Sequence, residues 1–255
     1  MGTGKKLKLY GERNTGTRYL TQLLEHNLSS VVIRGVVPRW ATWIQSLSPG
    51  KEGFRDTYFE RTFAHNLGWK HSQVQVDRLL GLGNRIGDVY FVALVKNPYS
   101  WLLSLDKRPY HHRQGLTVDS MGIETLLKSE WPTVGRENGP RAYRDAIDLW
   151  NCKVGSYLEL ANRLPTTILT YEALVADPAA ELDKLRRAAG SNWTQGRFEN
   201  LSESTKEKDK DSAYYLDYYG NERWRSKLSD EVIALINTRL SHTLMTEFGY
   251  SLLGV

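Results

Sequence analysis

The segment Gly11–Arg18, with the sequence GERNTGTR, has residue types and a spacing that suit the binding of a phosphate-like anion. Gly11 and Gly16 match the glycine half of the nucleotide-binding pattern G-x-x-x-x-G-K-[ST]. Thr17 and Arg18 stand where that pattern has its lysine and its magnesium-binding hydroxyl. The loss of both groups argues against the hydrolysis of a magnesium nucleotide.

The charges and hydroxyls of this segment supply an alternative way to hold an anion. A glycine loop between a strand and a helix exposes backbone N–H groups, and the N-terminus of the helix adds partial positive charge. Arg13 and Arg18 add full charges and forked donors, and Thr15 and Thr17 add hydroxyl groups. We therefore expect an anion site that needs no metal, although an ordinary strand–turn–helix corner has the same pattern.

The elements around the loop indicate an α/β protein. A short apolar strand at Leu7–Tyr10 precedes the loop, and a helix at Thr17–Asn27 follows it. Val89–Val95 is continuously apolar, which is typical of a strand covered on both faces, and a helix should begin near Pro98. Further strands are expected at Val31–Val37, Phe63–Lys70 and Thr166–Thr170. Three further helices are expected: one at Arg141–Leu164, one that Asp177 caps and Gly190 ends, and one from Ser229 to Gly249. Strands that alternate with helices predict one domain over residues 1–255, with a parallel sheet that binds ligands at the carboxyl ends of its strands.

Composition narrows the class of partner. The chain has 255 residues, with 34 lysines and arginines against 29 acidic residues. The resulting charge of +5 favours an anionic ligand but is too small to indicate a nucleic-acid surface. The single cysteine, Cys152, allows no internal disulfide. Because there is no long apolar run and no signal-peptide pattern at the start, we expect a cytoplasmic protein that does not bind a membrane.

Four segments, taken in order along the chain, resemble the sulfotransferases that use 3′-phosphoadenosine 5′-phosphosulfate (PAPS). The sequence ERNTGTRYL resembles the loop of that family that binds the 5′-phosphosulfate. The sequence LVKNPYSWLLS is similar to its 3′-phosphate motif, and ILTYEALVADP resembles its Y-E-x-L-x-x-D-P segment. The end of the chain, from YYGNERWRSK to FGY, is similar to the carboxyl-terminal end of the family.

The resemblance implies a three-layer P-loop fold in which a central parallel sheet is flanked by helices. It implies an enzyme that transfers the sulfuryl group of PAPS to a hydroxyl or amine of a small-molecule or saccharide acceptor, releases PAP and uses no metal. The donor-binding residues that it implies are Arg13, Asn14, Thr15, Gly16, Thr17 and Arg18 at the 5′-phosphosulfate, Lys96 and Ser104 at the 3′-phosphate, and Tyr171 at the adenine.

Sulfuryl transfer also needs a base that takes the proton of the acceptor. His71, in the sequence GWKHSQV, is our choice, because the family has a similar segment there, and Glu12 is the alternative. Lys70 could stabilise the sulfuryl oxygens or the leaving group. Trp69 could stack on the purine or pack in the core.

The chain also departs from the family pattern. Asn14 stands where the family has its loop lysine, so Arg13, Arg18 or Lys70 must supply that charge. Lys96 replaces an arginine and loses its fork. The carboxyl-terminal R-K-G-x-x-G-x-W-K loop is only partly present in YGNERWRSK, so Arg223 or Arg225 is expected at the 3′-phosphate, and we select Arg225.

Two other functions are compatible with these residues. One is a P-loop kinase or NTPase with a degenerate phosphate loop, which predicts magnesium-dependent binding of ATP. The other is a module that binds a PAP-like nucleotide without turnover. Segments 38–60, 106–116 and 203–222 are expected to shape the acceptor pocket, and the sequence predicts neither the acceptor nor the oligomeric state.

Overall fold

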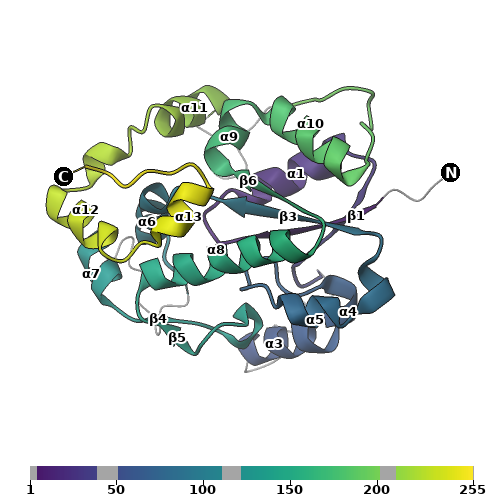
Figure 1. Cartoon of the computed structure of the whole chain (residues 1–255), viewed down its shortest axis with the longest axis horizontal. Helices are drawn as coiled ribbons and strands as arrows, with labels where there is room; N and C mark the ends of the chain where they lie inside the picture. The colour runs from purple at the N-terminus through teal and green to yellow at the C-terminus, as the bar shows by residue number, and fades with distance from the viewer. Residues whose placement is uncertain (1–4, 39–50, 111–121, 202–210, 255) are drawn as a thin grey trace.

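The centre of the molecule is a four-stranded parallel sheet with the strand order β2-β1-β3-β6 (Figure 1). Its strands are β1 (Lys6–Gly11), β2 (Val31–Ile33), β3 (Val89–Val95) and β6 (Thr166–Thr170). A separate antiparallel pair consists of β4 (Trp131–Pro132) and β5 (Ala142–Tyr143). The computed structural model describes residues 5–38, 51–110, 122–201 and 211–254.

Alternation along the central strands creates two hydrophobic cores, one on each face of the sheet. All seven residues of β3 are buried. Phe91, Ala93 and Val95 belong to one core, whereas Tyr90 and Val92 belong to the other. The prediction of a strand covered on both faces is therefore confirmed.

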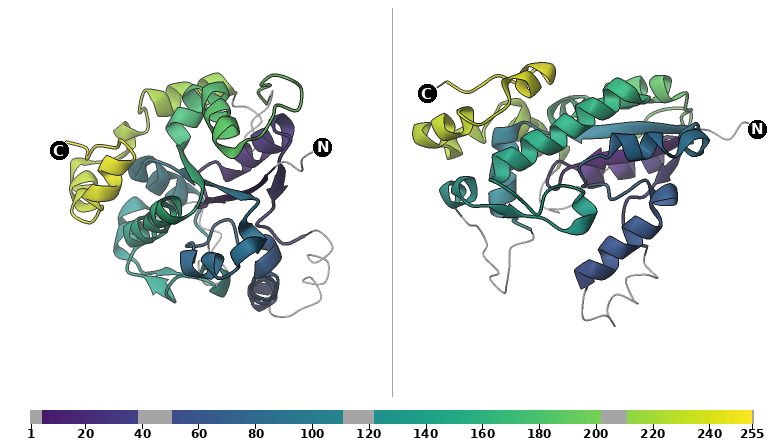
Figure 2. Two further views of the ribbon diagram at one scale, coloured as in Figure 1. Left: turned by 45° about the vertical axis from the view of Figure 1, so that its right-hand side comes forward. Right: turned by 60° about the horizontal axis from the view of Figure 1, so that its bottom comes forward.

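Helices flank both faces of the sheet, as Figure 2 shows. The core on one face includes residues of α1 (Thr17–Asn27), α9 (Tyr171–Ala176) and α10 (Pro178–Ala189). The core on the other face includes residues of α4 (Phe63–Asn66), α5 (Val76–Leu80), α6 (Pro98–Lys107), α7 (Ile123–Lys128), α8 (Ala146–Arg163), α12 (Asp230–Asn237) and α13 (His242–Glu247). The remaining helical elements are α3 (Lys51–Arg61), α11 (Ser212–Gly220) and the short 3₁₀ turns Gly83–Ile86, Gly135–Glu137 and Arg225–Lys227. Among the described residues, no helix has the length and apolar character needed to span a bilayer.

Several expected elements are confirmed with their bounds. The helix Thr17–Asn27 and the strand Thr166–Thr170 have the predicted limits. The carboxylate of Asp177 accepts a hydrogen bond from Ala180 N at 2.9 Å, and Gly190 ends α10 with a φ of 64°. A carboxylate N-cap and a left-handed glycine C-cap are the ordinary boundaries of a helix, which explains why the sequence predicted α10 correctly.

The prediction of a strand at Phe63–Lys70 is wrong. Residues Phe63–Asn66 form helix α4, which Leu67 and Gly68 end with φ values of 56° and 84°. The ammonium of Lys8 donates to the carbonyl oxygens of Asn66 and Gly68, at 2.6 and 2.5 Å, from inside the core. Burial lowers the pKa of Lys8 well below its usual range. The buried donor satisfies carbonyl groups that a helix end leaves free, and so stabilises the turn.

Other boundaries differ because local caps decide them. The helix expected over Arg141–Leu164 starts only at Ala146, because the buried Asp145 caps it by accepting from two backbone N–H groups at 2.8 Å. The helix expected from Ser229 to Gly249 is two helices, α12 and α13, and Ser241 caps the second. The second strand is confined to Val31–Ile33.

Candidate functional site

A cavity of about 1080 Å³ lies at the carboxyl ends of three neighbouring strands. Gly11 at the end of β1 pairs with Leu94 of β3, and Val95 pairs with Thr170 of β6. The loop after β1, Lys96 after β3 and Tyr171 after β6 therefore leave the sheet side by side. Ligands of open α/β sheets bind at this edge.

The loop between β1 and α1 presents the start of the helix to the cavity. Gly16 occupies the N-cap position with a φ of 88°, and no side chain of the described residues caps the first turn. Asn14, which also lines the cavity, has a φ of 64°, a conformation that is uncommon outside glycine. A Cβ on Gly16 would lie 2.5 Å from Cε2 of Tyr171, so the loop lies directly on the tyrosine ring.

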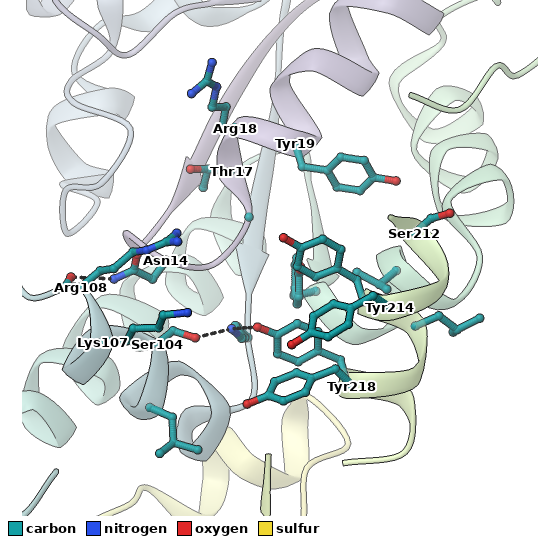
Figure 3. A pocket seen from close by; sticks show the side chains of 18 of the residues that line it. Asn14, Thr17, Arg18, Tyr19, Ser104, Lys107, Arg108, Ser212, Tyr214 and Tyr218 are labelled. Atoms are coloured by element: carbon teal, nitrogen blue, oxygen red, sulfur yellow. Dashed lines mark hydrogen bonds between the residues drawn. The ribbon is translucent and has the colours of Figure 1, made fainter. Parts of the chain in front are cut away.

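The polar side chains of this loop have different positions. Thr17, Arg18 and Asn14 line the cavity, and Arg18 is exposed at its edge, with its guanidinium directed away from Ser104 (Figure 3). Thr15 is buried, and its hydroxyl donates to the Glu12 carbonyl oxygen at 2.5 Å. Thr15 therefore shapes the loop from behind, whereas Asn14 and Thr17 face the space where a ligand would lie and Arg18 lies at its edge.

Two aromatic rings fix the side chain of Arg13 at the cavity. The guanidinium carbon lies 5.0 Å from the ring centroid of Trp69 and 4.5 Å from that of Tyr110. The indole N–H of Trp101 donates to the Arg13 carbonyl oxygen at 2.8 Å. Trp69 is only 6% exposed and is not among the residues that line the cavity, so it packs against Arg13 rather than offering a face to a purine.

Lys96 forms a second cationic centre, in the middle of the cavity. Its side chain is 2% exposed, and its ammonium donates to the hydroxyl oxygens of Ser104 at 2.8 Å and Tyr219 at 3.0 Å (Figure 3). The rings of Tyr219 and Tyr171 lie 4.3 and 5.1 Å from the same ammonium. Burial lowers the pKa of Lys96 to about 7, against the opposing charge of Glu172. The two hydroxyl groups that hydrogen-bond to this buried amino group are neutral, so an anion in the cavity can replace one of them as its partner.

His71 and Lys70 line the same cavity beside the phosphate loop. The Nδ1 atom of His71 lies 2.6 Å from the carbonyl oxygen of Gly11. Since a carbonyl oxygen only accepts, Nδ1 carries the proton and Nε2 carries the lone pair of the neutral ring. Burial, with the charge of Lys70, lowers the pKa of His71 well below its usual range. The ring is therefore neutral near pH 7 and can accept a proton at Nε2.

Glu12, the alternative base, has a different position. It is 2% exposed, is not among the cavity-lining residues, and forms an ion pair with the buried Lys153. Its other carboxylate oxygen accepts from the Tyr110 hydroxyl at 2.7 Å and from Arg13 N at 2.5 Å. These contacts place Glu12 behind the loop, whereas His71 lies at the cavity.

Four tyrosines on α11 form an aromatic wall of the cavity, within the segment 203–222 that was expected to shape the acceptor pocket, but the helix that carries them was not predicted. None of the nine residues of α11 is buried, and the rings stack in two pairs, Tyr214 on Tyr218 and Tyr215 on Tyr219, at centroid distances of 5.8 and 6.4 Å (Figure 3). The signal was present in the sequence SAYYLDYYG, because tyrosines four residues apart share a helix face.

The structure does not bring Arg225 to the cavity. Its guanidinium donates to the Gly254 carbonyl oxygen at 3.2 Å, and Arg223 pairs with Asp217 at 2.8 Å. Lys227, two residues further on, does line the cavity, with its ammonium 5.0 Å from the ring of Tyr218. Lys107 and Arg108, at the end of α6, line it too. The segment therefore does bring a basic residue to the cavity, but this residue is Lys227 and not Arg225.

The segments expected to shape the acceptor pocket lie partly outside the described residues, because 39–50, 111–116 and 203–210 are not described. The structure does describe α3, which begins within residues 38–60 and ends at Arg61, and α11, which lies within residues 203–222. Among the described side chains, no group of three or more His, Cys, Asp or Glu residues gathers where it could hold a metal ion.

The site thus contains two cationic centres and a neutral imidazole around one cavity. The first centre combines Arg13 with the start of α1, and the second is Lys96 with Ser104. Such an arrangement can hold one ligand with two separate anionic groups and can take a proton beside it. Comparison of the chain with protein-family models and with curated proteins finds no match.

Proposed function

We propose that the protein is a PAPS-dependent sulfotransferase with a three-layer P-loop fold. The observation that carries the proposal is the pairing of two cationic centres, at the ends of adjacent parallel strands, within one cavity. PAPS needs two such centres, because its 5′-phosphosulfate and its 3′-phosphate lie on different sides of the ribose.

In this proposal the start of α1, with Arg13, Asn14 and Thr17, holds the 5′-phosphosulfate. Backbone N–H groups at a helix N-terminus and a guanidinium fork are suited to that group without a metal. Lys96 and Ser104 hold the 3′-phosphate, which would replace the Tyr219 hydroxyl as the partner of the buried ammonium.

The nucleoside then lies between the sheet edge and the tyrosines of α11. Tyr171 stands between the two anion centres, since its ring touches the Gly16 position and lies 5.1 Å from the Lys96 ammonium. The four tyrosines of α11 offer flat faces on which a purine can stack. The remaining space, beside His71, is left for the acceptor.

The transfer reaction asks little covalent chemistry of the protein. An acceptor oxygen or nitrogen forms a bond to sulfur while the bond between sulfur and the bridging oxygen of PAPS breaks, and PAP leaves with the electron pair. His71 Nε2 takes the acceptor proton. Lys70 and Arg13 stabilise the negative charge that develops on the sulfuryl and bridging oxygens.

Ligand specificity separates this function from its rivals. We expect PAP and PAPS to raise the melting temperature without magnesium, and adenosine 5′-monophosphate (AMP) and ATP to do so less. A shift by ATP that requires magnesium would favour a kinase or NTPase instead. PAP binding without any release of PAP from PAPS, in the presence of a metabolite extract, would favour a non-catalytic module. A sulfuryl mass gain on a compound of that extract would identify the acceptor.

A further inference from the structure

A buried lysine on α8 connects the phosphate loop to the segment that carries His71. Lys153 has no exposed surface and is not among the residues that line the cavity. Its ammonium donates to the backbone carbonyl oxygen of His71 at 2.8 Å and to Oε2 of Glu137 at 2.6 Å, and it forms an ion pair with Glu12. One charged group therefore contacts three segments that are far apart in the sequence.

Each of these contacts continues into a part of the candidate site. Glu12 accepts from Arg13 N at 2.5 Å, so the carboxylate that Lys153 pairs with also holds the start of the phosphate loop. The Glu137 carbonyl oxygen accepts from Gln73 N at 2.8 Å, two residues after His71. The Nδ1–H group of His71 itself donates to the Gly11 carbonyl oxygen at 2.6 Å, at the first residue of the loop segment. The loop and His71 are thus connected twice, directly by the hydrogen bond from the imidazole to Gly11 O and indirectly by the contacts of Lys153 with His71 O and Glu12.

A buried group of two carboxylates and one ammonium is not an efficient way to stabilise a fold. Taking these charges out of water costs free energy that well-packed apolar side chains would not require. What the group adds is a fixed arrangement, because the three N–H donors of one buried ammonium are used by three acceptors, so the His71 carbonyl and the Glu12 carboxylate must lie around the same nitrogen atom. These contacts fix the backbone of His71 directly and that of Arg13 through Glu12.

We propose that Lys153 is a positioning residue, which sets the His71 imidazole relative to the phosphate loop. The role of His71 as base rests on the proposed sulfotransferase function, whereas the placement of its ring by Lys153 does not. Lys153 touches neither ligand nor reacting atoms in this proposal. It acts through the backbone of His71 and through Glu12.

The experiment uses two variants and one control. Lys153→Met removes the donor but leaves Glu12 and Glu137 buried without their cation, which is expected to destabilise the fold severely. The triple variant Lys153→Met, Glu12→Gln, Glu137→Gln keeps the shapes, removes all three charges and is expected to fold. Asp145→Asn is the control, because it weakens the buried cap of the same helix without touching His71.

The first readout is the nitrogen NMR spectrum of His71, assigned by its absence in His71→Gln. In the wild type and in Asp145→Asn we expect a neutral ring with its proton on Nδ1. In the triple variant we expect a mixture of tautomers, because the carbonyl of His71 is no longer held and the ring loses its fixed distance to Gly11 O. An unchanged single tautomer in the folded triple variant would overturn the proposal.

The second readout is the slow release of PAP from PAPS when water is the acceptor. We expect the triple variant to lower the rate constant about tenfold or more, the effect of misplacing a catalytic group, while the Kd for PAP changes less than about threefold. Equal rates in the triple variant and in Asp145→Asn would count against Lys153. If the wild type neither binds PAP nor releases it, the sulfotransferase function fails, and the tautomer of His71 alone decides on Lys153.

Discussion

The replacement of Lys96 by methionine tests the second cationic centre most directly. Methionine keeps the length and the apolar part of the side chain but removes the ammonium. If this ammonium binds a 3′-phosphate, the variant should lose affinity for PAP and keep its affinity for AMP, which lacks only that phosphate. The relevant quantity is the coupling free energy between the side chain and the phosphate, measured with both ligands on both proteins.

The structure sets the size of that coupling. A hydrogen bond to a charged group contributes about 1.5–3 kcal/mol. Because the pKa of Lys96 is about 7 in the free protein, roughly half of the molecules must first take up a proton at pH 7, which costs about 0.4 kcal/mol. The remaining coupling is about 1–2.5 kcal/mol, a loss of roughly 5- to 70-fold in PAP affinity.

Isothermal titration calorimetry at pH 7 measures the four dissociation constants. Lys107→Met is the matched control, because Lys107 also lines the cavity but is exposed at the end of α6. A screened surface charge should couple to the 3′-phosphate by less than about 1 kcal/mol. The reasoning would be refuted if the two lysine variants lost the same factor for PAP, or if Lys96→Met weakened AMP as much as PAP.

Three further predictions concern titration, catalysis and the loop. The pKa of Lys96 is about 7 in the protein without ligand, so above pH 7 a proton must be taken up when PAP binds. The affinity for PAP should therefore fall as pH rises from 7 to 9, by up to about tenfold per pH unit. Calorimetry should find no such dependence on pH for AMP or for Lys96→Met. His71→Gln should lower PAP release from PAPS by about 10²–10⁴-fold while the Kd for PAP changes little; unchanged release, followed by chromatography, would place the base elsewhere. Gly16→Ala should destabilise the fold by about 1–3 kcal/mol, because of its φ of 88° and the contact with Tyr171. The control is Gly155→Ala on α8, where an added Cβ would meet no atom within 4 Å. This control should raise the free energy of unfolding by about 0.5–1 kcal/mol. Similar melting temperatures for the two variants would contradict the strain argument.

The parts of the fold that could be predicted are those that local chemistry decides. The seven apolar residues of Val89–Val95 are all buried, and the cap Asp177 with Gly190 sets both ends of α10. The glycine loop was predicted in the same way, because Gly16 occupies the N-cap with a left-handed φ of 88°, which glycine adopts without strain.

The failures come from contacts between distant residues. Phe63, Leu67 and Trp69 all occupy odd positions, as the residues on one face of a strand would, but the segment folds as a helix and turn whose carbonyl groups bind the buried Lys8. A lysine inside a strand carries no sign of such a partner. Likewise, nothing in YGNERWRSK distinguishes Arg225 from Lys227 until the packing of Trp224 in the core directs one away from the cavity and the other toward it.

The order of the strands, which the motifs alone do not specify, is what makes a single ligand for both centres reasonable. β1 and β3 are direct neighbours, about 4.8 Å apart. Because Gly11 pairs with Leu94, Arg13 and Lys96 follow their strands at the same level. A strand between them would double the separation. A nucleoside triphosphate carries its charges in one chain, which the loop after β1 could bind alone, and would leave the buried Lys96 with no anion to bind. A nucleotide with separate 5′ and 3′ anions uses both centres, and for that reason we favour the PAPS type of donor over ATP.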